Sequence, residues 1–253
     1  MPRRPPLQQA ITIRFYEELN DFLAPSHRKT TFEYHFQGKP SVKDAIEGLG
    51  VPHTEVDLIL VNGVSVDFGY CLRPGDRISV YPVFESLDIS SLNRLRPSPL
   101  RRTGFVADVH LGKLVRLLRL MGFDTSYRHD FDDREIVQES IQQRRIILTR
   151  DRGLLKHGNV THGYYVRNVC PLDQAREVVR RFDLEKQVNP FSRCIECNAT
   201  LETVAKDELY DRLPERTRRF FYEFYICTGC SKIYWKGSHY EQLRKKLQTI
   251  LGD

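Results

Sequence analysis

Short apolar runs that stop at an aspartate occur twice in the middle of this 253-residue chain. Residues 105–107 lead directly into Asp108, and residues 146–149 lead, one residue later, into Asp151. A short apolar run bounded by polar residues is typical of a strand buried on both faces of a parallel sheet. Ligands of such sheets bind at the carboxyl ends of the strands. We therefore expect these two carboxylates to face one cleft.

A third acidic position, Asp133, lies between these runs at the predicted start of a helix. A carboxylate also suits the N-terminal end of a helix dipole, and Asp151 could cap a turn, so structural roles stay open for both residues. Carboxylate oxygens are hard ligands that suit Mg²⁺ or Mn²⁺. The set Asp108, Asp133 and Asp151 therefore predicts an acidic divalent-metal site.

Four of the six cysteines form two pairs, Cys194 with Cys197 and Cys227 with Cys230, and each pair encloses two residues. Paired cysteines with this spacing predict a tetrahedral zinc site rather than disulfides in an intracellular chain. The two pairs are further apart than in the usual zinc ribbon. Four thiolates leave no open coordination position, so we expect the zinc to be structural.

The net charge of +6 is unevenly distributed. Residues 101–190 carry 17 Lys and Arg against 12 Asp and Glu, whereas residues 1–100 carry 11 against 12. An acidic site inside a basic segment suits a polyanionic substrate bound through metal, although a charge of this size also serves solubility. No apolar run approaches the roughly 20 residues that cross a bilayer, and no apolar segment follows the basic N-terminus. We therefore expect a cytoplasmic protein without a membrane partner.

The N-terminal third predicts a β-grasp domain. Alternating residues predict strands at the beginning of 10–20 and at 31–36, a helix follows at 40–50, and further strands are expected at 56–61 and 77–82. This order resembles the ubiquitin-like and sulfur-carrier proteins, most closely at the Asn-Gly and Pro-Gly-Asp turns. The chain has no Gly-Gly after the last strand, which argues against sulfur carriage. A docking role toward a protein partner is the alternative that we favour.

Residues 87–103, rich in Ser, Pro and Arg, are predicted to form a linker. An alternating α/β domain follows, with a parallel sheet and helices expected at 111–121, 133–144 and 172–182. Basic and aromatic residues on this domain and beside the cysteines are candidates for RNA contact. These candidates are Lys113, Arg116, Arg119, Arg150, Arg152, Trp235, Lys236 and His239.

The residues from Phe105 to Asp124, the pair at 132–133, the stretch 147–155 and the cysteine-rich tail resemble the Mut-seven C-terminal RNase family. That resemblance covers essentially the whole chain. It implies a ubiquitin-like domain at 1–86, a PIN-like nuclease domain at 104–190 and a zinc-ribbon-like module with four cysteine ligands at 191–253. It also implies a metal-dependent ribonuclease whose acidic set is Asp108, Asp133 and Asp151, with Asp124 as a further acidic residue.

The chain departs from the PIN-like pattern at one point. Residues 152–157 contain no carboxylate, where such nucleases often have one more acidic residue. Three carboxylates suffice for one metal ion, but a second ion would lack a ligand. Two functions follow: a metal-dependent endoribonuclease that hydrolyses RNA phosphodiester bonds, or a non-catalytic RNA- or ribonucleoprotein-binding protein with a degenerate site.

Overall fold

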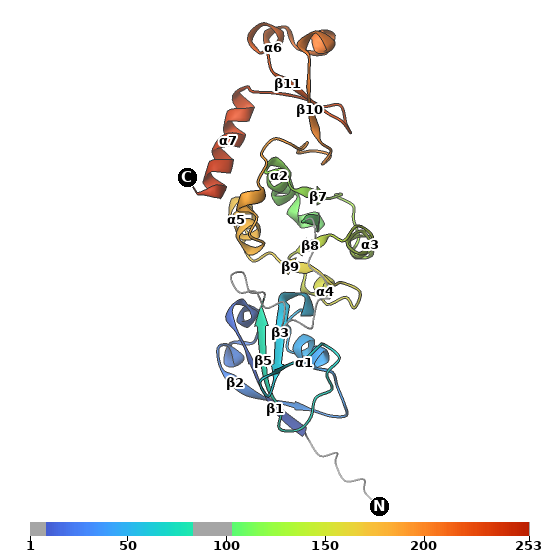
Figure 1. Ribbon diagram of the computed structural model, residues 1–253, viewed down its shortest axis with the longest axis vertical. Coiled ribbons are helices and arrows are strands. Elements are labelled where there is room, and N and C mark those ends of the chain that lie inside the picture. The colour runs from blue at the N-terminus through green and yellow to red at the C-terminus, as the bar shows by residue number, and fades with distance from the viewer. Residues whose placement is uncertain (1–8, 83–102, 253) are drawn as a thin grey trace, which may run out of the picture. The chain divides into compact units, whose positions relative to one another are not determined.

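The structure is a computed structural model that describes residues 9–82 and 103–252 (Figure 1). The chain divides into two compact units. The first unit comprises residues 1–101 and 151–165, and the second comprises residues 102–150 and 166–253. The predicted linker at 87–103 lies, except for residue 103, outside the described residues, and the predicted domain boundaries stay predictions. No helix in the described parts of the chain is long and apolar enough to cross a membrane.

The first unit is built on a five-stranded sheet with the order β2-β1-β5-β3-β4. The predicted hairpin is confirmed, because β1 (Gln9–Phe15) pairs antiparallel with β2 (Thr31–Phe36). The central pair, β1 and β5 (Arg77–Pro82), is parallel. β3 (Val56–Val61) pairs antiparallel with β5, and β4 (Val64–Ser65) closes the edge. This is the expected ubiquitin-like β-grasp.

Helix α1 (Val42–Gly48) begins where the sequence predicts, at Ser41. The Ser41 hydroxyl accepts a hydrogen bond from the Asp44 backbone N–H at 3.1 Å, and the Asp44 carboxylate accepts one from the Ser41 N–H at 2.9 Å. This reciprocal cap satisfies two donors that a helix start otherwise leaves open. The shorter elements of the unit are η1 (Glu17–Phe22), η2 (Pro25–His27), η3 (His53–Glu55), α4 (Arg152–Leu155) and β9 (Gly163–Tyr165).

Residues 151–165 are held in the first unit by buried polar groups of the β-grasp. The ring of His53 contacts the Glu47 carboxylate through Nδ1 and the carbonyl oxygen of Val160 through Nε2, both at 2.7 Å. Glu55, which is fully buried, accepts the backbone N–H of Tyr165 at 2.6 Å. We call these five residues the histidine seam. It supplies side-chain partners for backbone groups that lie more than 100 residues away in the sequence.

Two longer side chains of the same segment also pack within this unit. The Arg152 guanidinium lies over the rings of Phe22 and Tyr165, at 5.0 Å and 5.5 Å from their centroids. The Lys156 ammonium donates to the backbone carbonyl of Glu47 at 2.8 Å. The segment that begins at Asp151 is therefore fixed by cation–π contacts as well as hydrogen bonds.

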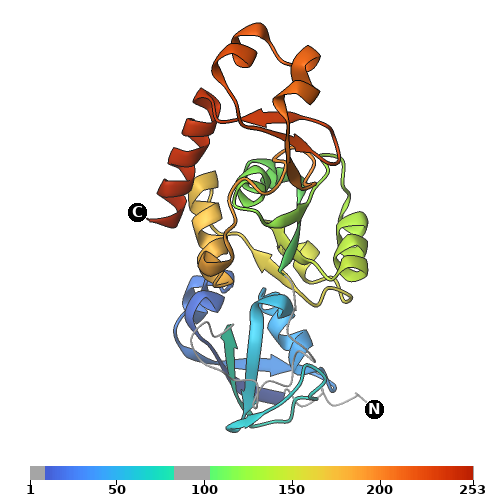
Figure 2. The same ribbon diagram turned by 45° about the horizontal axis from the view of Figure 1, so that its top comes forward.

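The second unit contains the predicted parallel sheet. β6 (Gly104–Ala107) lies between β7 (Asp124–Ser126) and β8 (Ile146–Thr149), parallel to both. Helix α2 (Gly112–Leu120) connects β6 to β7, and α3 (Asp133–Gln143) connects β7 to β8. Right-handed crossovers in opposite directions put these helices on opposite faces of the sheet (Figure 2). The carboxyl ends of the three strands share one edge.

Apolar side chains on α2 form the buried face that the spacing predicts, with Leu114, Val115 and Leu118 at 0–1% exposure. The helix ends as expected at Gly122, which has a φ of +94°. A Cβ at Gly122 would collide with the carbonyl oxygen of Asn189. This glycine therefore permits both the left-handed turn and the close approach of the chain that leads to the cysteines.

The C-terminal part of the unit is a three-stranded antiparallel sheet of β10 (Leu201–Val204), β11 (Phe224–Cys227) and β12 (Ile233–Trp235). The last helix, α7 (Ser238–Leu251), lies beside α5 (Pro171–Arg181), and Arg176 donates to the carbonyl of Thr249 at 2.6 Å. The remaining elements are η4 (Val109–Leu111), η5 (Glu185–Gln187), η6 (Lys206–Arg212) and α6 (Glu215–Phe220).

Candidate active site and cysteine centre

Asp108 stands at the carboxyl end of β6, as the sequence predicts, and its side chain is 7% exposed. The Thr149 hydroxyl, at the end of the neighbouring strand β8, donates to Asp108 Oδ2 at 2.6 Å. The Asp108 backbone N–H donates to the carbonyl of Leu148 at 3.0 Å. These bonds fix the orientation of a buried carboxylate at the shared edge of two parallel strands.

Thr149 was not among the predicted site residues. A polar side chain that closes an otherwise apolar strand was the available signal, since residues 146–148 are apolar and all four residues of β8 are buried. A buried hydroxyl needs a hydrogen-bond partner. Its partner here is the predicted catalytic carboxylate, which makes Thr149 a positioning residue for Asp108.

Asp133 is the first residue of α3 and is exposed. Its neighbour Asp132 caps the helix, because Asp132 Oδ1 accepts the Glu135 N–H at 2.8 Å and Glu135 Oε2 accepts the Asp132 N–H at 2.9 Å. Asp132 is therefore the cap of α3. Asp133 lies in the first turn of the helix, a position that also fits the helix-dipole role left open for it.

Asp151 follows β8 by two residues in the chain and caps the short helix α4. Its Oδ1 accepts the Gly153 N–H at 2.7 Å, so the turn-capping role raised by the Asp-Arg-Gly sequence is present. Asp151 is therefore a capping residue with an exposed side chain.

Three of the predicted RNA-contact arginines are engaged inside the protein. Arg150 Nη1 donates to the carbonyls of Val166, Arg167 and Asn168 at 2.7–2.9 Å. Arg152 stacks on the two aromatic rings described above. Arg119 is 3% exposed.

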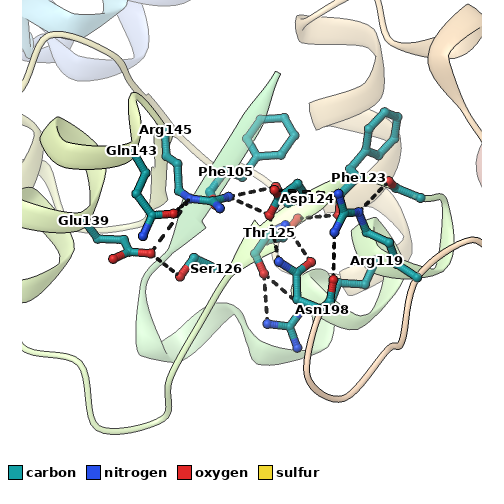
Figure 3. Close-up of polar contacts among 12 residues, drawn as sticks. Phe105, Arg119, Phe123, Asp124, Thr125, Ser126, Glu139, Gln143, Arg145 and Asn198 are labelled. Carbon is teal, nitrogen blue, oxygen red and sulfur yellow. Dashed lines mark hydrogen bonds and ion pairs between the residues drawn. The ribbon is translucent and has the colours of Figure 1, made fainter. Parts of the chain in front are cut away.

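Arg119 belongs to a polar network between α2, β7 and the first cysteine turn (Figure 3). Its Nε and Nη2 donate to the carbonyl of Thr125 at 3.0 Å and 2.9 Å. Its Nη1 donates to the carbonyls of Ile195 and Glu196, which lie inside the first cysteine pair. One buried guanidinium thus joins the parallel sheet to the turn that presents Cys194 and Cys197.

Asp124 occupies the centre of the same network (Figure 3). Its Oδ1 accepts from Arg145 Nη1 and from Asn198 Nδ2, both at 2.7 Å. Burial alone would raise the pKa of Asp124, but the bonds from Arg145 and Asn198 outweigh it and hold the pKa below the ordinary value. The carboxylate is therefore used to dock the cysteine turn. We call Arg119, Asp124, Thr125, Arg145, Ile195, Glu196 and Asn198 the arginine seam.

The four paired cysteines converge as predicted. Among the described residues, they are the one group of three or more His, Cys, Asp or Glu side chains whose ligand atoms all lie within 4.8 Å of one another. The Sγ atoms of Cys194 and Cys230 are 3.7 Å apart, and those of Cys197 and Cys227 are 3.2 Å apart. Zinc–sulfur bonds of about 2.3 Å in a tetrahedron place sulfurs about 3.8 Å apart, so this donor set fits zinc.

The surroundings of the four cysteines shift their thiol pKa values in different directions. Burial opposes ionisation of Cys194, but hydrogen bonds from the Tyr234 hydroxyl at 3.0 Å and from the backbone outweigh it and lower its pKa to about 7. Burial, followed by neighbouring thiols, raises the pKa of Cys230 to about 12. A bound cation would remove this imbalance by stabilising every thiolate. Gly229 is required for space, because a Cβ there would lie 2.8 Å from the Cβ of Ala199.

Four of the predicted RNA-contact residues line one cavity of about 290 Å³ beside the cysteine sheet. These residues are Arg116, Trp235, Lys236 and His239. Lys113 is exposed on α2. The structure thus brings together candidates from α2, β12 and the start of α7 that are more than 100 residues apart in the sequence.

Comparison with known proteins agrees with this organisation. The family model described as Mut7-C RNAse domain matches residues 103–247, and the one described as Mut7-C ubiquitin matches residues 8–88. The solved structure of SAMP1 from Haloferax volcanii is 17% identical, covers 31% of this chain and 99% of its own, and has a TM-score of 0.25. That of H. volcanii small archaeal modifier protein 1 is 18% identical with 30% and 99% coverage and a TM-score of 0.25.

No curated protein matches the chain. The two family models, however, together account for the β-grasp, the parallel sheet and the cysteine centre. Because the RNase-domain match spans more than half of its length, the chain belongs to the Mut7-C RNase family, with a Mut7-C ubiquitin domain preceding the RNase domain.

Proposed function

We propose that the protein is a metal-dependent endoribonuclease in which Asp108, Asp133 and Asp151 hold Mg²⁺ or Mn²⁺. The observation that carries this proposal is the buried carboxylate of Asp108, fixed by Thr149 at the carboxyl ends of two adjacent parallel strands. Each of the three aspartates follows a different strand of the same parallel sheet in the chain. Ligand sites of such sheets form at that edge.

The proposed reaction is hydrolysis of an RNA phosphodiester bond. A metal ion bound by carboxylates lowers the pKa of a coordinated water and offsets the charge of the transition state. Asp108 supplies a preoriented oxygen ligand, and Thr149 keeps that carboxylate from rotating. Asp133 contributes an exposed carboxylate at a helix start, and Asp151 contributes a carboxylate two residues beyond β8.

Lys113 and Arg116 on α2 are the proposed contacts to the RNA backbone from this domain. Both are exposed, and Arg116 also pairs with the exposed carboxylate of Glu196. The guanidinium groups of Arg119, Arg150 and Arg152 are packed against other parts of the chain. Cations on one helix face attract a polyanion through a salt-sensitive term. The ubiquitin-like domain adds a surface for a protein partner, whose identity this proposal leaves to experiment.

Cleavage of mixed cellular RNA with added Mn²⁺ or Mg²⁺ tests the proposal. We expect cleavage that requires the added metal and is abolished in Asp108→Asn. Asp173→Asn is the matched control, because it neutralises a carboxylate of the same unit that pairs with Arg176 on α5. Absence of cleavage by the unaltered protein under every metal condition, with zinc still bound, would refute the proposed ribonuclease activity.

Thr149→Val sharpens the test because it removes only the hydroxyl that orients Asp108. Loss of an outer partner of a metal ligand typically costs about 10–100-fold in metal affinity or activity. We expect a higher Mn²⁺ concentration for half-maximal cleavage in this variant. An unchanged metal dependence would remove Thr149 from the proposed mechanism.

Non-catalytic RNA binding is the second candidate. The observation in its favour is that residues 152–157 contain no carboxylate, where PIN-like nucleases often have one more acidic residue. Salt-sensitive RNA binding without cleavage, unchanged or strengthened in Asp108→Asn, would support this candidate.

A further inference from the structure

The cavity beside the cysteine sheet has the shape and chemistry of a site for a single ligand. It is about 290 Å³ in volume and is lined mainly by apolar and aromatic side chains. Tyr225 and Tyr234 occupy paired positions on β11 and β12, so their rings lie on the same face of the sheet. Tyr240, at the start of α7, adds a third ring, which packs at a tilt of 32° against Phe191 with 4.4 Å between centroids. Small-molecule sites start at about 300 Å³, a size that suits one ring system.

Trp235 lies at the border between this cavity and the protein interior. It is paired with Phe224, so its side chain points to the opposite face of the sheet from Tyr234. Its ring packs near Phe221, with centroids 6.4 Å apart, in the small core of the cysteine module. Trp235 also lines the cavity. Its indole is therefore a fixed neighbour of the cavity rather than its main stacking surface.

The rim of the cavity carries excess positive charge. Lys232 and Arg116 both bind Glu196, with all three bonds at 3.0 Å, so two cations share one carboxylate. Lys236 and His239 also line the cavity and are exposed. Lys236 pairs with Glu223, which is outside the cavity. An anionic group at the rim would thus meet more positive than negative charge.

A second hollow of about 420 Å³ adjoins the aromatic cavity and shares with it Phe191, Leu201, Tyr225, Lys236 and Tyr240. Three of its other four lining residues, Asn189, Ser192 and Thr203, are polar, and the fourth is Pro190. An aromatic cavity joined to a polar hollow through a lysine matches a ligand that is flat and apolar at one end and anionic at the other.

We propose that this cavity binds one unpaired nucleotide of an RNA chain, with the base against Tyr225 and Tyr240 and the sugar and phosphate in the adjoining hollow near Lys236. Bases of single-stranded RNA bind by stacking on aromatic side chains, and the phosphates bind to nearby cations. The choice of RNA as the ligand rests on the proposed function, to which this cavity adds a binding site for the substrate. Its occupant is a splayed single-stranded nucleotide, because a base inside a duplex cannot enter a cavity.

The single tryptophan of the chain provides a direct test, because Trp235 lines the cavity. The zinc-loaded full chain is titrated with AMP, GMP, CMP, UMP and a five-nucleotide single-stranded RNA, without added Mg²⁺ or Mn²⁺. We expect saturable quenching of tryptophan fluorescence by the nucleotides. Ribose 5-phosphate, which has no base, should not quench at the same concentration. Absence of quenching by every nucleotide, or equal quenching by ribose 5-phosphate, would overturn the proposal.

Two variants test the two ends of the nucleotide. Tyr240→Leu removes one flat face and should weaken binding at least about fivefold, the lower limit for a stacked base. Tyr222→Leu is the matched control, because Tyr222 is 77% exposed and lies outside the cavity. Lys236→Glu should weaken nucleotides about fivefold or more, yet leave adenosine and uridine unchanged, since nucleosides carry no phosphate.

Zinc content and circular dichroism are measured for each variant. If Tyr240→Leu loses zinc or structure, Lys236→Glu decides, because that side chain is exposed. Unchanged nucleotide affinity in a folded Tyr240→Leu, or equal loss of nucleosides and nucleotides in Lys236→Glu, would refute the site. Asp108→Asn should bind nucleotides normally. Failure of the cleavage assay would therefore count against the nuclease alone, and failure of the binding assay would count against the nucleotide site.

Discussion

Each unit joins two distant parts of the chain through buried polar groups, but the two seams differ in what supports them. The arginine seam binds the first cysteine turn, whose geometry four thiolates and a zinc ion would also fix. The histidine seam binds residues 151–165 with hydrogen bonds, and cation–π contacts of Arg152 with Phe22 and Tyr165 hold the same segment. A buried polar contact costs desolvation and contributes little net free energy unless every partner is satisfied. In the second unit, metal coordination can offset the desolvation cost. In the first unit, aromatic packing must offset it.

Removal of zinc should have the largest effect and should act on the second unit only. We expect Cys227→Ser to abolish zinc binding and to unfold the antiparallel cysteine sheet, because structural zinc binding contributes on the order of 10 kcal/mol to folding. Zinc release and Trp235 fluorescence report on this sheet. Cys170→Ser, at an exposed and isolated cysteine, is the control. A Cys227→Ser protein with native fluorescence would show that the arginine seam alone holds the sheet.

Breaking the arginine seam at Asp124 should have the next largest effect. Asp124→Ala removes the nearer carboxylate partner of Arg145, which is only 12% exposed, and leaves it Glu139 at 3.9 Å. Loss of one partner of a largely buried ion pair costs about 3 kcal/mol. The midpoint of urea unfolding measures this loss. Asp130→Ala, which breaks a fully exposed pair with Arg128, should leave the midpoint unchanged.

The contribution of Asp124 should depend on pH in a defined direction. Its folded pKa is below the reference value of 3.8, so folding favours the ionised form. The stabilisation is therefore fully present above that value and is lost as the pH falls through the folded pKa. The stability difference between the unaltered protein and Asp124→Asn should shrink on acidification below pH 3.8. A difference that grows there would contradict the assignment.

Breaking the histidine seam should have a smaller and more local effect. His53→Ala removes the partners of the Glu47 carboxylate and the Val160 carbonyl, at a cost of about 1–3 kcal/mol. We expect faster amide hydrogen exchange in residues 151–165 and little change in the cysteine sheet. His35→Ala, at an exposed histidine of β2, is the control. An equal increase of amide exchange rates in both units would mean that the histidine seam does not stabilise residues 151–165 locally.

The smallest effect should come from the rim of the arginine seam. Arg116 and Glu196 form two parallel hydrogen bonds at 3.0 Å, but their side chains are 50% and 37% exposed. Exposed pairs contribute about 0–1 kcal/mol. Arg116→Gln should therefore lower the unfolding midpoint only slightly. A loss as large as that of Asp124→Ala would place the pair among the main supports of the cysteine turn.

The sequence was sufficient for the elements and for the convergence of the four paired cysteines, because periodic apolar residues, caps and paired cysteines are local signals. It predicted Ser41 as a cap, Gly122 as a helix end and Asp108 at a strand end. Of the three predicted RNA-contact residues on α2, Lys113 and Arg116 are exposed but Arg119 is buried. Six residues of helix rotate Arg119 about 120° away from Lys113, which takes Arg119 from the exposed face into the interior. Two residues three apart on a helix lie next to each other. A longer series with this spacing drifts around the helix and does not stay on one face.

Contacts between distant segments had no comparable signal. His53 and Glu55 lie in a short 3-10 turn, where no periodicity distinguishes a buried polar residue from an exposed one. Asp124 has the same difficulty, because a carboxylate at a strand looks alike in sequence whether it binds metal or arginine. The predicted acidic site itself stays a prediction, apart from the position of Asp108 and its bond to Thr149.

The insertion of residues 151–165 into the first unit affects how the protein can be divided. Two separate segments of the chain belong to the first unit. A single cut in the chain therefore cannot separate the two units. A shortened chain beginning at residue 103 would retain Tyr165 and Val160 but lose the Glu55 and His53 that satisfy them. We expect such a fragment to be poorly soluble, and coexpression of residues 1–101 to rescue it. The ubiquitin-like domain would then act as an intramolecular chaperone for the chain that follows it.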